Sequence, residues 1–223
     1  MAGLLRIAVL ASGRGSNLRA LLQSKADAGL AIDIVGVFSD RPGCPALAVA
    51  AEAGIATFAQ RPAEFANRDA YDDELFSRIA AVQPDLIVCA GYMRLISNAA
   101  VSRFKGKMIN IHPSLLPKYP GLHTHARALA AGDSVHGASV HCVIPQLDAG
   151  AVIAQTRIQV LPGDFPESLA NRLLEREHAL LVQTVRALAD GELDISGNLP
   201  RWHGAPITTP LSPGQHGHLE ESR

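Results

Sequence analysis

The sequence is poor in cysteine and in lysine, and both shortages restrict what the protein can be. Its three cysteines, Cys44, Cys89 and Cys142, lie far apart and form no C-x-x-C pair, so we expect reduced thiols in the cytoplasm and no disulfide framework. Four of the 223 residues are lysine and the formal net charge is −1. A chain without a basic surface is not expected to bind nucleic acid, so an anionic partner should be small and bound locally.

Long apolar runs are also missing. No stretch approaches the ~18 apolar residues of a membrane span, although 48% of the chain is hydrophobic. The N-terminal run is interrupted by Arg6, and a glycine-rich turn follows where a signal peptide would have its cleavage site. Because aromatic residues make up 4% of the chain, we expect a core of Val, Ile, Leu and Ala. These features predict a soluble cytoplasmic protein with no membrane partner.

Short apolar runs alternate with helical patterns over most of the chain. The runs are residues 7–11, 32–38, 86–90 and 108–111, and the helical patterns between them cover residues 17–28, 45–53 and 68–82. Short continuous strands that alternate with helices predict a single Rossmann-like α/β domain, with a mostly parallel sheet and helices on both faces.

The second half of the chain predicts a different arrangement. Residues 138–144 and 152–160 are joined by a short turn, which indicates an antiparallel pair at the edge of the sheet. A long helix is predicted over residues 166–189, with a proline in its first turn. We therefore assign residues 1–190 to a catalytic domain and residues 191–223 to a C-terminal extension that is partly a loose tail.

A glycine-rich turn, SGRGSN at residues 12–17, joins the first strand to an apolar helix. Such a turn exposes backbone N–H groups at a helix N-terminus, where they can bind a phosphate. Gly13 and Gly15 are similar to the start of a dinucleotide-binding fingerprint, but the third position is Leu18, and Asp40 is the candidate for the ribose-binding acid. The alternative is a tight turn with Ser16 or Asn17 as the helix N-cap.

The strand at residues 108–111 ends in Asn110 and His112, which precede a proline-rich loop. Two residues apart on a strand, they project from the same face, at the end where ligands of open α/β sheets bind. An amide and an imidazole can both donate to an oxyanion that develops on a carbonyl under attack, and a histidine can also carry a proton. The alternative is a polar pair that only anchors the loop.

The sequence has no G-x-S-x-G elbow and no cysteine placed as a nucleophile. Direct transfer between two bound substrates is therefore favoured over a covalent acyl-enzyme. Asp148 lies in the turn between the two later strands, where an Asp commonly serves only the turn. If Asp148 lies near His112, its carboxylate should raise the pKa of the imidazole and favour the charged form.

Four motifs occur in order along the chain: SGRGSN (12–17), AGYMRLI (90–96), NIHPSLLPKYPG (110–121) and LDAG (147–150). Through them the chain closely resembles the phosphoribosylglycinamide formyltransferases, folate-dependent formyltransferases of de novo purine synthesis. The resemblance covers roughly residues 6–190. It implies transfer of the formyl group of 10-formyltetrahydrofolate to the amino group of glycinamide ribonucleotide, through a tetrahedral intermediate and without a metal. The catalytic residues that it implies are Asn110, His112 and Asp148, with Asp148 holding His112 charged.

The same resemblance implies which residues bind the two small-molecule substrates. For the ribonucleotide these are Gly15, Ser16, Asn17 and Glu177. For the folate they are Arg68, Met93, Arg94, Leu95, Ile96, Asn110, Val143 and Leu147. Leu174 departs from the family, because a polar residue can stand at that position. The oligomeric state stays open between a monomer and a homodimer.

Other functions are less compatible with the sequence. A methionyl-tRNA formyltransferase would need an RNA-binding domain after the last helix, and a formyltetrahydrofolate hydrolase would need a regulatory domain before Ile7. A nicotinamide-dependent oxidoreductase could use the glycine turn and Asp40. A metal enzyme is disfavoured because His123, His125 and the His141–Cys142 pair lack a third ligand at a recognisable spacing.

Overall fold

The computed structural model describes residues 3–214 and 217–222, and its chain forms two compact units, residues 1–110 and residues 111–223. Strand β5 (Met108–His112) runs across the boundary between them. In hydrogen-bonded order the strands of the large sheet are β3-β2-β1-β4-β5-β6-β7. The expected α/β fold with a mostly parallel sheet is confirmed.

The first unit contains the parallel strands, and their order follows from the apolar runs. Strand β1 lies between β2 and β4, and its four residues Ile7 to Leu10 are completely buried. Each of these strands is flanked by helices on both sides, so apolar residues can occupy both faces of the strand. The bounds are β1 Leu5–Leu10, β2 Ile32–Ser39, β3 Thr57–Ala59 and β4 Leu86–Cys89.

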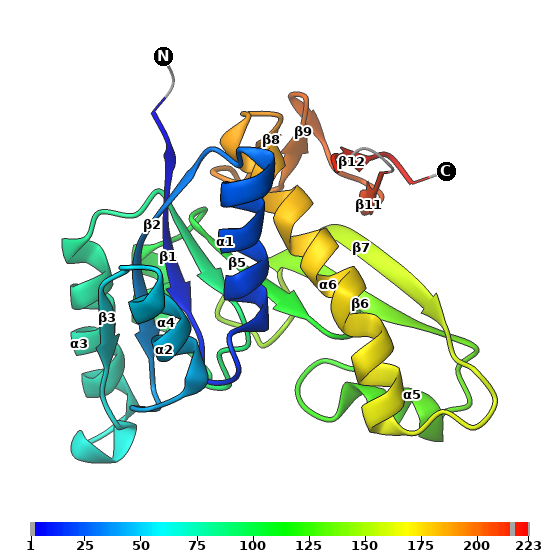
Figure 1. The fold of residues 1–223 in the computed structure, drawn as a ribbon, viewed down its shortest axis with the longest axis horizontal. Coiled ribbons are helices and arrows are strands. Elements are labelled where there is room, and N and C mark those ends of the chain that lie inside the picture. Colours follow the sequence, from blue (N-terminus) through cyan, green and yellow to red (C-terminus); the bar gives the residue numbers. More distant parts are fainter. Residues whose placement is uncertain (1–2, 215–216, 223) are drawn as a thin grey trace. The chain divides into compact units, whose positions relative to one another are not determined.

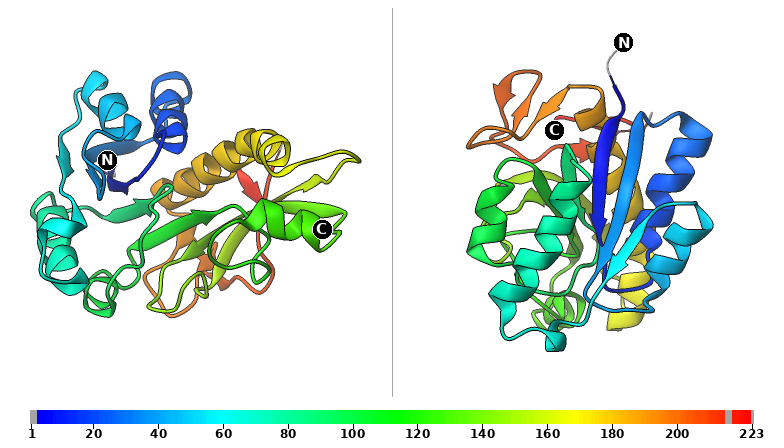
Figure 2. Two further views of the ribbon diagram at one scale, coloured as in Figure 1. Left: turned by 90° about the horizontal axis from the view of Figure 1, so that it is seen from below. Right: turned by 90° about the vertical axis from the view of Figure 1, so that its left-hand side faces the viewer.

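Helices cover both faces of these strands, as Figure 2 shows in its right-hand view. Helices α1 and α2 pack beside each other on one face, and α3 packs beside α4 on the other. Helix α3 buries Tyr71, Leu75 and Ile79, the residues that the helical period of the sequence places on one side. The bounds are α1 Ser16–Ala28, α2 Pro45–Glu52, η1 Pro62–Glu64, α3 Arg68–Ala81 and α4 Asn98–Arg103.

The second unit is built on an antiparallel pair, β6 (Val135–Cys142) and β7 (Val152–Gln159), as the sequence predicts. The short helix α5 (Thr124–Ala130) precedes the pair, and the long helix α6 (Pro166–Ala189) packs on both strands (Figure 1). Its apolar stripe is completely buried from Leu169 to Val185. The turn between β6 and β7 carries Asp148.

The C-terminal extension is more ordered than its composition suggests. Strands β8, β9 and β10 form a small sheet, and β11 pairs with β12. Leu211 exchanges backbone hydrogen bonds with Ile153 and Gln155 at the outer edge of β7, and it is 2% exposed. These pairings order several positions of its described part, and a partly loose tail stays a prediction. The bounds are β8 Leu193–Asp194, β9 Arg201–Trp202, β10 Ala205–Pro206, β11 Ser212–Pro213 and β12 Leu219–Glu220.

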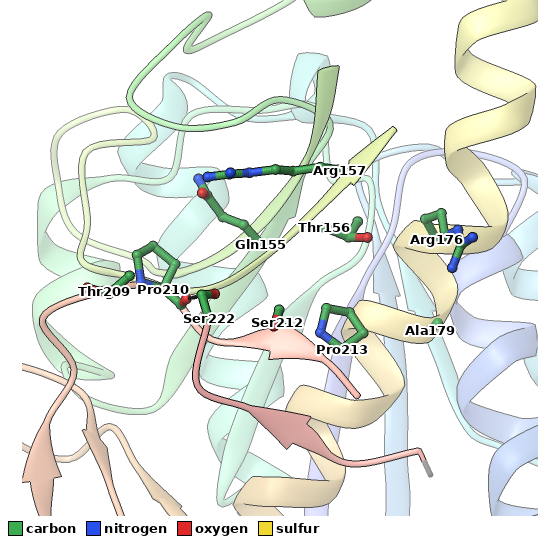
Figure 3. A pocket seen from close by; sticks show the side chains of 10 residues that line it. All are labelled: Gln155, Thr156, Arg157, Arg176, Ala179, Thr209, Pro210, Ser212, Pro213 and Ser222. Atoms are coloured by element: carbon green, nitrogen blue, oxygen red, sulfur yellow. Dashed lines mark hydrogen bonds between the residues drawn. The ribbon is translucent and has the colours of Figure 1, made fainter. Parts of the chain in front are cut away.

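This extension borders a cavity of about 340 Å³ between β7, α6 and the chain around Pro210 (Figure 3). Thr156, Arg157 and Arg176 contribute to its walls. None of the residues that the sequence predicts for a substrate site lines this cavity. In the part of the chain that the structure describes, no helix is long and apolar enough to cross a membrane.

Candidate active site

The structure brings His112 and Asp148 together. His112 ends β5 and is 5% exposed, and its Nδ1 lies 3.5 Å from Oδ2 of Asp148. The 35 intervening residues include α5 and the whole of β6, so only the folded chain creates this pair. Asn110 precedes His112 by two residues on the same strand, and the two side chains therefore share one face of β5.

The local backbone explains how Asp148 reaches this position. Its φ of 48° lies in the left-handed region, which Asp tolerates better than most residues. A Cβ at Gly150 would lie 1.8 Å from the carbonyl oxygen of Cys142, so only glycine fits two residues later. The backbone N–H of Gly121 donates to Oδ2 of Asp148 over 2.8 Å.

A second histidine, which the sequence argument does not identify, shares the carboxylate. Nε2 of His141 lies 3.6 Å from Oδ1 of Asp148, and its Nδ1 lies 2.9 Å from the carbonyl oxygen of Cys142. A carbonyl only accepts, so Nδ1 carries a proton and orients the ring. Burial alone would raise the pKa of Asp148, but the hydrogen bonds from His141 and Gly121 and the electrostatic interaction with His112 bring it below its ordinary value.

Opposing effects act on the pKa of His112. Burial lowers this pKa below its ordinary value, and this outweighs the raising effects of the Tyr119 carbonyl and of Asp148. Asp148 therefore acts on His112 in the predicted direction, and burial of the ring acts against it. That Asp148 holds His112 charged stays a prediction.

The proline-rich loop after β5 contacts His112 directly. Nε2 of His112 donates to the carbonyl oxygen of Tyr119 over 2.9 Å. Two buried side chains from the β6–β7 pair hold this loop. Leu116 N–H donates to Oγ of Ser139, and Nε2 of Gln155 donates to the Leu116 carbonyl oxygen over 2.9 Å. The sequence offers one signal for these residues, because Ser139 lies between two apolar residues of β6 and Gln155 follows three apolar residues of β7.

The glycine turn at residues 12–17 lies in the first unit, where Gly15 is the N-cap of α1. The alternative with Ser16 or Asn17 as the cap is wrong. Gly15 has a φ of 75°, and a Cβ there would lie 2.8 Å from Cα of Ala46, so the turn packs closely on α2. No side chain caps the first N–H groups of α1, and Oδ1 of Asn17 is buried without a hydrogen-bond partner among the described residues. The uncapped N–H groups favour the phosphate-binding interpretation because they are donors, whereas Oδ1 of Asn17 is an acceptor like the phosphate oxygens and adds nothing to it.

Asp40 is already engaged within the first unit. It is 6% exposed and accepts a hydrogen bond from the Ser12 hydroxyl over 2.5 Å. The same Ser12 oxygen accepts from the backbone N–H of Met93 over 3.0 Å. Asp40 therefore orders two loops, and this role weakens its interpretation as a ribose-binding acid.

The residues that the resemblance assigns to folate have two kinds of surroundings. Met93 and Leu95 are 58% and 50% exposed, which is a large exposure for apolar side chains. The guanidinium of Arg94 lies over the ring of Tyr71, 5.4 Å from its centroid. Arg68 begins α3 and is about half exposed, with its Nε 3.9 Å from Asp69.

The remaining assigned residues lie in the second unit. Leu147 is 52% exposed next to Asp148, and Val143 follows the end of β6. Glu177 lies in the middle of α6 and is 9% exposed, and burial raises its pKa to about 7. Such a carboxyl can donate or accept a hydrogen bond near neutral pH.

Burial suppresses the ionisation of two cysteine thiols. Burial raises the pKa of the Cys89 thiol to about 12 and that of Cys142 to about 11, so both stay protonated near neutral pH. Within residues 3–214 and 217–222, no group of three His, Cys, Asp or Glu side chains is placed to hold a metal ion.

The family model described as formyl transferase matches residues 5–185, and the chain belongs to this family. Among curated proteins, the phosphoribosylglycinamide formyltransferase of Escherichia coli (strain K12) is 43% identical over 194 residues, which are 87% of this chain and 92% of that protein. The protein of that name from Mycobacterium tuberculosis (strain ATCC 25618 / H37Rv) is 44% identical over 86% of this chain and 88% of its own.

Solved structures agree with this grouping. The phosphoribosylglycinamide formyltransferase of Coxiella burnetii has a TM-score of 0.87 and 43% identity, over 92% of this chain and 96% of that chain. A formyltetrahydrofolate deformylase from Burkholderia mallei has a TM-score of 0.79 and 26% identity, and the match covers 90% of this chain but 70% of that chain.

Proposed function

We propose that the protein transfers the formyl group of 10-formyltetrahydrofolate directly to the amino group of glycinamide ribonucleotide. The observation that carries the proposal is the buried His112–Asp148 pair, with 3.5 Å between Nδ1 and Oδ2, at the end of a strand that also presents Asn110. Membership of the formyl transferase family and relatives of this activity at 43% and 44% identity support it.

The substrate amine attacks the formyl carbon, and the carbonyl electrons move to its oxygen. The Asn110 amide donates a hydrogen bond to this oxyanion, and so does the Nε2–H of His112 once it leaves the Tyr119 carbonyl oxygen to which it donates in the structure. When the tetrahedral intermediate collapses, the bond to the folate nitrogen breaks, and that nitrogen takes up the proton that the amine has lost. His112 has a lowered pKa and can accept the proton and return it, while Asp148 stabilises the charged form in between.

A covalent acyl-enzyme is not needed for this route. The Cys142 thiol has a raised pKa, and the Ser114 hydroxyl near His112 in sequence donates to the Lys118 carbonyl oxygen over 2.6 Å. A thiol that stays protonated and a hydroxyl without a base are poor nucleophiles. Direct transfer through one tetrahedral intermediate is therefore the proposed course.

Substrate recognition follows the two sets of residues described above. The N–H groups of Gly15, Ser16 and Asn17 at the start of α1 bind the phosphate, and Glu177 binds a ribose hydroxyl. The residues that bind the folate are Arg68, Met93, Arg94, Leu95, Ile96, Asn110, Val143 and Leu147. Residues 1–190 supply the catalytic domain, and the reaction takes place in the cytoplasm without a metal.

The test is a formyl-transfer assay with both substrates, run for the parent protein, His112→Ala and the control His203→Ala. His203 is an exposed histidine of the C-terminal extension. Loss of one oxyanion donor typically costs about 10²–10³ in rate, so His112→Ala should lose at least this much and the control should not. Formate release by the parent protein without the ribonucleotide would instead point to a hydrolase. A parent protein that does not transfer the formyl group when both substrates are present would contradict the proposal.

A further inference from the structure

Asp72 on helix α3 is a buried carboxylate that the proposed reaction does not use. It is 0% exposed, less than any other Asp, Glu, His, Lys or Arg among the described residues. Burial raises the pKa of Asp72 above its ordinary value, although Ser97, Arg68 and Arg94 act in the opposite direction. No cation lies within ion-pair distance of this carboxylate in the described part of the chain. Burying a carboxyl group lowers the stability of the protein unless the group is hydrogen-bonded or paired.

The carboxylate of Asp72 holds the chain just after residues 93–96, the segment assigned to folate. The backbone N–H of Ser97 donates to Oδ2 of Asp72 over 2.6 Å. Ser97 is itself buried and is the N-cap of α4, where its Oγ accepts from the N–H of Ala100. Asp72 therefore ties α3 to the first residue after the folate segment.

The start of the same segment is held in a similar way. The N–H of Met93 donates to Oγ of Ser12, which in turn donates to Asp40. Between these two ends, the side chains of Met93 and Leu95 are 58% and 50% exposed. Apolar packing therefore does little to fix the position of the segment. Its geometry depends on the two end contacts and on Arg94, which lies over the ring of Tyr71, the neighbour of Asp72.

We propose that Asp72 is a positioning residue for folate binding, which acts through Ser97 and the 93–96 segment without touching the substrate. This inference rests on the proposed function, because residues 93–96 are assigned to folate there. Both arginines of that assignment, Arg68 and Arg94, also interact electrostatically with Asp72. A single buried carboxylate thus influences the backbone and both cations of the folate site.

The alternative is that Asp72 only joins α3 to α4 and contributes to stability. The two roles differ in their kinetic signature. A positioning residue for folate should change the Kd and KM for folate and leave the KM for glycinamide ribonucleotide unchanged, whereas a purely structural residue should change neither in the protein that remains folded.

The experiment compares the parent protein with Asp72→Ala, Asp72→Asn and the control Asp73→Asn, the neighbouring exposed acid on the same helix. Folate binding is measured by calorimetry with 10-formyltetrahydrofolate, and both KM values are measured by the transfer assay. A lost charge-assisted hydrogen bond predicts about a tenfold rise in folate Kd for Asp72→Ala, and about threefold for Asp72→Asn, which keeps an acceptor for Ser97. The ribonucleotide KM should stay within about twofold in all variants, as should every constant of Asp73→Asn.

An unchanged folate Kd in folded Asp72→Ala would overturn the proposal. If that variant does not fold, Asp72→Asn decides, and an unchanged folate Kd there has the same meaning. Equal increases of both KM values would also overturn it, because they would indicate a general structural effect. A parent protein that does not bind folate would refute the proposed function itself, before any variant is compared.

Discussion

Gly15→Ala tests whether the glycine turn needs its unusual backbone. Gly15 has a φ of 75°, and an added Cβ would lie 2.8 Å from Cα and 3.0 Å from Cβ of Ala46. The left-handed conformation costs an alanine about 1–2 kcal/mol, and a contact this close with backbone adds a further cost of about 1–3 kcal/mol. We therefore expect the free energy of unfolding to fall by about 2–5 kcal/mol.

For a chain of this size, that loss corresponds to a decrease in Tm of roughly 4–20 °C. Differential scanning calorimetry or urea denaturation measures the change. If the turn binds phosphate, the displaced N–H groups should also raise the KM for glycinamide ribonucleotide, by about tenfold for each 1.4 kcal/mol lost. The KM for folate should change much less.

Gly13→Ala is the matched control in the same turn. Gly13 has no positive φ, and an added Cβ would meet nothing within 4 Å. We expect its Tm and its KM for ribonucleotide to stay close to those of the parent protein. Equal Tm values for Gly15→Ala and Gly13→Ala would refute the argument from backbone strain.

Two further predictions concern buried polar groups of the second unit. Burial raises the pKa of Glu177 from 4.5 to about 7, so its contribution to stability is present below pH 4.5 and is lost as the pH rises through 7. At about 1.4 kcal/mol per unit, the parent protein should lose up to about 3 kcal/mol relative to Glu177→Gln between pH 4.5 and 8, and parallel unfolding curves of the two proteins would contradict this. Gln155→Leu removes the donor to the Leu116 carbonyl and to Ser139, and should cost about 1–3 kcal/mol in urea denaturation. The exposed Gln159→Leu serves as its control, and an equal loss there would show that the buried amide contributes nothing specific.

The arrangement of strands was predictable because each strand carries its own signal. The runs around Val9, Val37 and Val88 are apolar on both faces, which only a sheet covered on both sides accommodates. The antiparallel pair followed from the short turn at Asp148. The C-terminal extension lacked such signals, because its packing rests on single residues such as Leu211 and Leu219 in a chain rich in Gly and Pro.

The site residues that belong to a motif could be predicted from the sequence. Residues whose role depends on burial in the folded chain were harder to predict. His112 and Asp148 could be named from motifs, yet their contact depends on the fold of the 35 residues between them. His141 gave no distinct signal, because a histidine in an apolar strand is compatible with several roles. Asp72 has a signal in the sequence, since it lies four residues before Phe76 on the buried side of α3, where an acidic residue is unexpected.

The charge of His112 shows how burial can reverse an argument from proximity. Oδ2 of Asp148 lies near His112 and accepts from Gly121, and Oδ1 lies near His141. Asp148 raises the pKa of His112, whereas the neighbouring His141 lowers it. Burial of the imidazole then prevails, and the ring is neutral near neutral pH. A neutral ring suits the proposed chemistry better than the expected imidazolium, because only a neutral ring can accept the proton that the attacking amine releases. The charged ring then forms next to a carboxylate that is already ionised. We infer that Asp148 matters most during the proton transfer and least in the resting protein.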